Sequence, residues 1–196
     1  MISLDQLVGL NRQAVLASAA AVGRCVEPTA PTPCRGWQLA DLLAHMAVQH
    51  VGFARAARGE QTGVADWQPR PLADPIADYV EACADVLGSF AALDDPATPV
   101  MLPELRDAPV PAQTAVGFHL LDYVVHTWDV AVSVGGDVPI ASDVLDAALA
   151  IARQVPDGPA RAAPGAAFAH ALPVPPGSSV LAELLLLVGR DPRWPG

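Results

Sequence analysis

Lysine is absent from this sequence of 196 residues, so all 11 basic side chains are arginines. Acidic residues number 21, which gives a formal net charge of −10. A protein that binds nucleic acid neutralises phosphates with a basic face, and one that binds anionic membranes needs clustered basic residues. The sequence therefore argues against nucleic acid and against a membrane surface as partners.

Cysteine is also scarce. Cys25, Cys34 and Cys83 are odd in number and form no C-x-x-C pair, so we expect free thiols in a reducing compartment. The first residues lack the basic and apolar regions of a secretory signal peptide. The apolar run from Leu184 to Val188 is too short to span a bilayer. We therefore expect a cytoplasmic protein.

Apolar residues are abundant, at 52%, and they recur at helical spacing. Ser3 and Gln6 form a capping box, Asp74 before Pro75 is a strong helix start, and Ser142 is a further candidate cap. We predict helices over about residues 4–24, 38–58, 75–93, 112–134, 142–154 and 180–188. The segment 156–179 is rich in proline and glycine, and we expect a loop there with a short extended piece near residues 168–174.

The predicted fold class is all-α. We expect one domain over residues 1–196, with an antiparallel four-helix bundle over about 1–135 and a helical tail over about 136–196.

The helix predicted over 112–134 is apolar around its whole circumference, which is typical of a buried helix. Its ionisable residues fall on one narrow face, at His119, Asp122, His126 and Asp129. Buried ionisable groups need partners or a metal ion. Asp122 and His126 lie one turn apart and could hold one ion together, whereas His119 lies two turns from His126. A stripe of histidine–carboxylate pairs that needs only hydrogen bonds remains an equally good interpretation of this helix alone.

A third ligand would have to come from another helix. The helix predicted over 38–58 offers His45 and His50, which point about 140° apart because they are five residues apart. At most one of them faces the metal candidates, and periodicity alone does not choose between them.

Three segments carry a resemblance to a known family. Residues 32–45 read T-P-C-R-G-W-Q-L-A-D-L-L-A-H, residues 122–131 read D-Y-V-V-H-T-W-D-V-A, and residues 189–192 read G-R-D-P. Together they resemble the DinB-like metal-binding bundles, in the branch of the mycothiol-dependent maleylpyruvate isomerase N-terminal domain. The matches fall near the beginning, in the middle and at the end, so the resemblance covers nearly the whole chain.

The resemblance implies a ligand set of one histidine from the earlier helix and an acid plus a histidine from the later one. Carried onto this sequence, these are His45, Asp122 and His126. The acid is usually glutamate in the family, so Asp122 is one methylene shorter, and the ion would have to lie closer to its helix.

The resemblance also implies the chemistry. One divalent ion, zinc first and nickel, iron or manganese as alternatives, would keep open positions beside its three protein ligands. A small-molecule thiol, with mycothiol as the candidate, would bind there and attack a small electrophile, which is transferase or isomerase chemistry. The alternative is a non-catalytic metal-binding module that acts as a sensor or binds a partner. A homodimer is a further expectation from the resemblance. The net charge argues against a nuclease.

Three other residues near these motifs have two interpretations each. Asp129 could orient His126 or could be an ordinary acid near the helix end. Asp41 could orient His45, but an acid in a first helical turn is the simpler interpretation. Cys34 lies near the start of the helix predicted over 38–58, where the pKa of a thiol can fall, but a structural role is the simpler interpretation because no nucleophile–base pair is visible.

Overall fold

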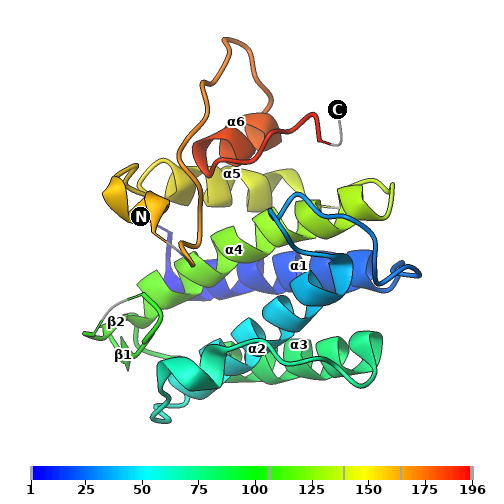
Figure 1. Ribbon diagram of the computed structural model, residues 1–196. Coiled ribbons are helices and arrows are strands. Elements are labelled where there is room, and N and C mark those ends of the chain that lie inside the picture. The colour runs from blue at the N-terminus through cyan, green and yellow to red at the C-terminus, as the bar shows by residue number, and fades with distance from the viewer. Residues whose placement is uncertain (1, 106, 139, 164, 195–196) are drawn as a thin grey trace.

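The computed structural model describes residues 2–105, 107–138, 140–163 and 165–194, and this part of the chain is mainly helical (Figure 1). The prediction of an all-α protein is therefore confirmed. The helices are α1 (Leu4–Val22), α2 (Leu39–Ala57), α3 (Pro75–Ala91), α4 (Ala112–Ser133), α5 (Ser142–Ala152) and α6 (Val180–Leu187). Short 3-10 turns lie at η1 (Val64–Trp67) and η2 (Pro159–Ala162), and β1 (Pro99–Val100) pairs with β2 (Val110–Pro111).

The predicted starts of the first and third helices are confirmed by their caps. The Ser3 hydroxyl accepts from the Gln6 backbone N–H at 3.2 Å, and the Gln6 side chain accepts from the Ser3 backbone N–H at 3.0 Å. Asp74 accepts from the Ala77 backbone N–H, and Pro75 is the first residue of α3. These bonds satisfy backbone donors that the first turn of a helix leaves without partners.

The helices pack in successive layers (Figure 1). α2 lies against α3, α1 lies against α4, α5 covers α1 and α4, and α6 packs on α5. α4 is buried along most of its length, as its apolar sequence predicts. Because α4 also contacts α2, side chains of these two helices can meet in the interior. No helix in the described residues is long and apolar enough to cross a lipid bilayer.

The structure corrects one predicted helix cap, at Ser142, and adds a strand pair that the sequence did not predict. The segment around residues 168–174 lies in an irregular connection, as expected, and the Leu172 backbone N–H donates to the Leu186 carbonyl. The two-residue strands β1 and β2 form in the proline-rich connection before α4. Ser142 is the first residue of α5, after an Ala141 cap without a side-chain bond.

The loop after α2 is fastened to that helix by Trp67. The indole is buried and lies directly over Gly52, where a Cβ atom would come within 2.6 Å of the ring. The indole N–H donates to the Thr62 hydroxyl at 3.0 Å. Gly52 is therefore required by close packing at this point of α2.

Candidate metal centre

His45, Asp122 and His126 converge between α2 and α4. One ligand atom from each of the three side chains lies within 4.8 Å of the other two. The Asp122 Oδ1 is 3.5 Å from the His126 Nε2, and the rings of His45 and His126 meet edge to face with centroids 5.3 Å apart. His126 is buried, whereas the other two are partly exposed, so the group has one accessible side.

The geometry of these three side chains fits a divalent ion. Two atoms about 2.1 Å from a tetrahedral zinc ion lie about 3.4 Å apart, which is close to the separation of Asp122 and His126. The shorter aspartate therefore brings its oxygen near enough to His126 for both to reach one ion. Two nitrogens and one oxygen are also donors that zinc, nickel and iron accept.

The structure separates the two histidines of α2. His45 turns toward α4 and lies beside Trp37, with the two rings tilted by 54° and their centroids 4.9 Å apart. His50 lies in the interior, where its Nδ1 is 3.0 Å from the His119 Nε2 and its Nε2 is 3.2 Å from the Tyr79 hydroxyl. His119 is therefore used in a second network and lies apart from His45 and His126.

The second network has one consistent direction of hydrogen bonding. The Ser18 hydroxyl donates to the Val15 carbonyl, so it accepts from Tyr79, which in turn accepts from the His50 Nε2. The His50 Nδ1 then accepts from the His119 Nε2. The Asn11 amide completes this series of hydrogen bonds by donating to the His119 Nδ1 at 2.8 Å. Both imidazoles are neutral in this arrangement, so the network ties helices together without a buried charge.

Asp129 lies one turn after His126 on α4 and contacts its ring. Its Oδ2 is 2.9 Å from the His126 Nδ1, and its side chain is fully buried. A carboxylate at this nitrogen fixes the ring orientation and leaves Nε2 free to face an ion. Of the two interpretations of Asp129, the structure supports the orienting partner.

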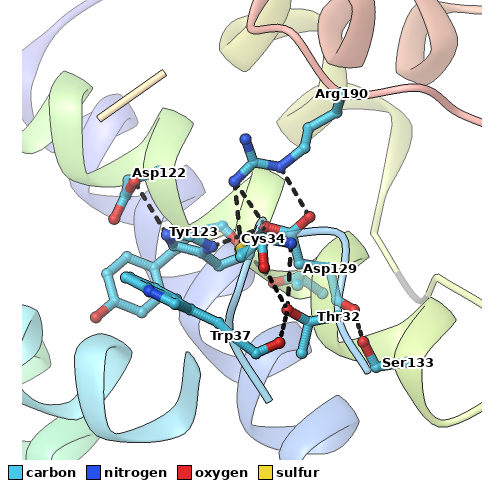
Figure 2. A network of polar contacts seen from close by, with 10 residues as sticks. Thr32, Cys34, Trp37, Asp122, Tyr123, Asp129, Ser133 and Arg190 are labelled. Carbon is cyan, nitrogen blue, oxygen red and sulfur yellow. Dashed lines mark hydrogen bonds and ion pairs between the residues drawn. The ribbon is translucent and has the colours of Figure 1, made fainter. Parts of the chain in front are cut away.

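Arg190 holds Asp129 from the other side (Figure 2). Its Nε is 3.1 Å from the Asp129 Oδ1 and its Nη2 is 3.2 Å from Oδ2, which is the two-pronged geometry that arginine forms with carboxylates. The sequence identified the G-R-D-P segment but not this contact. A hint was available, since a buried acidic stripe in a chain without lysine needs an arginine as its partner.

Cys34 is the other residue whose surroundings the sequence did not predict. Its Sγ is 3.3 Å from the Asp129 Oδ2 and 3.3 Å from the Arg190 Nη2. The turn around it is fixed by Thr32, whose hydroxyl accepts from the Cys34 backbone N–H and contacts the Trp37 carbonyl (Figure 2). The thiol is thus buried beside the metal candidates.

Asp41 acts as a helix cap, as the simpler interpretation held. Its carboxylate accepts from the Gln38 backbone N–H at 3.0 Å, at the first turn of α2.

Charge pairing controls protonation in the group. Burial opposes the charged form of His126, but the Asp122 and Asp129 carboxylates outweigh it and hold the pKa of His126 well above its ordinary value. Burial, followed by the charge of His126, lowers the pKa of His45 to about 3, so this imidazole is neutral as a metal ligand must be. Burial raises the pKa of Asp122, and His126 partly offsets that effect. The carboxylates of Asp122 and Asp129 thus favour a positive charge on or beside the His126 ring.

Gln49 and Glu104 form a polar pair whose carboxyl group feels the charge of Asp122. Gln49 lies one turn after His45, and its amide donates to the Glu104 Oε2 at 2.7 Å. Burial raises the pKa of Glu104, and the negative charge of Asp122 raises it further. The connection that contains β1 and β2 therefore brings a carboxyl group toward the metal candidates.

Comparison with known proteins gives a consistent result. Residues 11–131 match the family model described as the mycothiol maleylpyruvate isomerase N-terminal domain. Two uncharacterized proteins from two strains of Mycobacterium tuberculosis, Rv0738 and MT0763, are each 27% identical over 97% of this chain and 100% of their own length. The crystal structure of the mycothiol-dependent maleylpyruvate isomerase has a TM-score of 0.54 and 18% identity, over 77% of this chain and 70% of that chain. This structural likeness concerns the fold alone.

The residues that match the family model include His45, Asp122 and His126, while Arg190 lies beyond them.

Proposed function

Since the chain belongs to the mycothiol maleylpyruvate isomerase N-terminal domain family, we propose that it is a metal-dependent enzyme that uses a small-molecule thiol. It acts as a transferase or an isomerase on a small electrophilic substrate. The convergence of His45, Asp122 and His126 within 4.8 Å is the main support, because two histidines and one carboxylate leave coordination positions open. Open positions are typical of catalytic rather than structural sites.

Each residue has a separate task in this proposal. His45, Asp122 and His126 hold the ion, with zinc as the first candidate. The Asp129 carboxylate accepts a hydrogen bond from the His126 Nδ1–H and keeps Nε2 directed at the ion. When bound, the ion stabilises the thiolate form of a thiol at its open position. Trp37 beside His45 supplies a wall for the substrate.

The thiol is proposed to be mycothiol, on the strength of the family description and of the solved isomerase. The thiol and the electrophile enter from the partly exposed side of the group, at His45 and Asp122. A thiolate there attacks an electron-poor carbon of the substrate, because the thiolate is the nucleophilic form of sulfur.

The test is an assay that follows the consumption of both thiol and electrophile, with mycothiol and a panel of small electrophiles that includes maleylpyruvate, because a transferase consumes the thiol whereas an isomerase regenerates it. Zinc-loaded protein is compared with chelated protein and with the chelated protein after zinc is restored. We expect consumption that disappears with the metal and returns with it. Equal rates with and without metal would contradict a role for the ion. A protein that binds zinc but converts no electrophile, with or without consumption of the thiol, would favour the non-catalytic metal-binding module.

A further inference from the structure

A second ligand group lies on the other side of His126. Ligand atoms of Cys34, His126 and Asp129 lie within 4.8 Å of one another, and all three residues are buried. Sulfur, imidazole nitrogen and carboxylate oxygen are donors that zinc and cobalt accept together. His126 belongs to this group and to the candidate metal centre, so the chain has two ways to bind an ion at one histidine.

The space beside the second group is taken by a guanidinium. The Arg190 Nη2 is 3.3 Å from the Cys34 Sγ and 3.2 Å from the Asp129 Oδ2, while its Nε reaches the Asp129 Oδ1. Arg190 thus contacts two of the three donors of the group (Figure 2). Its side chain is only 13% exposed, so its charge is largely withdrawn from water.

We infer that Arg190 is the resident cation of the Cys34–His126–Asp129 group and keeps a metal ion from binding there. The arginine thereby confines the ion to the Nε2 side of His126, among nitrogen and oxygen donors. A guanidinium is suited to this task because it is always charged, cannot be displaced by deprotonation and is fixed by its fork to the carboxylate.

The inference differs from a purely structural role for the ion pair. A salt bridge that only supports the fold would leave the choice of metal ligands unchanged when it is removed. If Arg190 is the resident cation, its removal leaves the buried Asp129 carboxylate without its arginine partner, and such a charge favours another cation. The Cys34 thiol then binds that ion as a thiolate and releases its proton to solvent, while His126 binds it through Nδ1 with its own proton on Nε2.

The inference rests on the same histidine as the proposed function but does not require an enzyme. It concerns which side chains of this chain bind a metal, so metal binding alone can test it.

The experiment is a titration with cobalt(II), whose absorption spectrum shows a charge-transfer band when a thiolate is a ligand. For the wild type we expect bound cobalt without this band. For Arg190→Met, which keeps a long apolar stem without the charge, we expect the band to appear. It should disappear again in Arg190→Met/Cys34→Ser, and Arg190→Lys should restore the wild-type spectrum by returning a cation. Arg193→Met is the matched control, because Arg193 is exposed and pairs with Asp191.

A sulfur band in the wild type, or folded Arg190→Met without such a band, would overturn the inference. Folding of each variant is checked by circular dichroism. If Arg190→Met does not fold, Cys34→Ser alone still decides, because the inference requires it to bind cobalt with wild-type affinity and spectrum. A tenfold loss of affinity in Cys34→Ser would overturn it. Wild-type protein that binds no cobalt would contradict the proposed function, while a sulfur band in Arg190→Met would still support the inference.

Discussion

The imidazole rings of His45 and His126 meet edge to face across α2 and α4, with their centroids 5.3 Å apart. In the described residues the two rings share no hydrogen bond, and the polar partners of His126 are Asp129 and Asp122. A neutral imidazole at His45 thus faces an imidazole whose Nε2 is oriented by Asp129. An ion between them would receive two nitrogens from different helices and so would tie α2 to α4.

Metal content is the first property to measure. We expect about one divalent ion per chain in wild-type protein and a loss of most of it in His126→Ala, because His126 supplies the most buried ligand atom. His170→Ala is the matched control, since His170 is exposed and pairs with Asp157 away from α4. Elemental analysis of the purified proteins gives the answer. Wild-type protein without metal, even after zinc is added, would contradict the ligand set.

Asp129→Asn tests the orienting role of the buried carboxylate. The substitution keeps the size of the side chain but removes the charge that fixes the His126 ring, so we expect zinc affinity to fall about 10- to 100-fold. Competition with a chromophoric chelator measures the change. Asp41→Asn is the control, because Asp41 only caps α2, and it should keep wild-type affinity. Equal affinities in the two variants would mean that Asp129 does not orient a ligand.

The buried pair His50 and His119 should make the protein sensitive to acid. Burial lowers the pKa of His119 to about 3, and burial together with His119 lowers the pKa of His50 well below its ordinary value. A histidine in the unfolded chain has a pKa of about 6.5. As pH falls below this value, the unfolded chain binds protons at His50 and His119, whereas the folded chain does not. The contribution of these two histidines to the free energy of unfolding is therefore fully present at neutral pH. It is lost as pH falls from about 6.5 toward the pKa values of the folded state.

The contribution of His119 can be isolated by a difference measurement. Urea unfolding of wild type and His119→Gln at several pH values between 7 and 4 gives two slopes of unfolding free energy against pH. We expect the variant's slope to be shallower by about 1.4 kcal/mol per pH unit below about pH 6, because it lacks one proton-binding site in the unfolded state. Parallel slopes for wild type and His119→Gln would show that His119 titrates normally when folded.

Gly52 and Gly88 provide opposite outcomes for the same substitution. A Cβ at Gly52 would lie 2.6 Å from the Trp67 ring, so Gly52→Ala should lower the free energy of unfolding by about 1–3 kcal/mol. Gly88 lies in α3 with nothing within 4 Å of its missing Cβ, so Gly88→Ala should raise stability by up to about 1 kcal/mol. Thermal and urea unfolding measure both. Changes of equal sign would contradict the close packing of Trp67 on α2.

Helix positions were predictable because their signals are local. The Ser3–Gln6 capping box and the Asp74–Pro75 start lie within a few residues of the helix ends that they fix. The hairpin of β1 and β2 was missed because each strand is two residues long and includes a proline. Such short pairing depends on how the connection is closed over α4, and no residue pattern in the sequence records it.

The candidate site was only partly predictable, for a geometric reason. Asp122, His126 and Asp129 share one helix, so their spacing places them on one face without further information. The choice between His45 and His50 depends on how α2 crosses α4, and here the family resemblance supplied what periodicity could not. The contact of Arg190 with Cys34 joins segments that are 156 residues apart, and no spacing rule reaches that far.

That separation has a consequence for the order of folding. Cys34 is 95 residues from Asp129 along the chain and 156 from Arg190, so their contacts close very long loops. Closing such loops costs chain entropy, and the formation of local helices does not offset this cost. Contacts between residues far apart in the sequence therefore slow folding. We therefore expect the polar centre to gain its native contacts late, after the individual helices have formed. The ability to bind a metal ion at His126 would then report that the chain has finished folding.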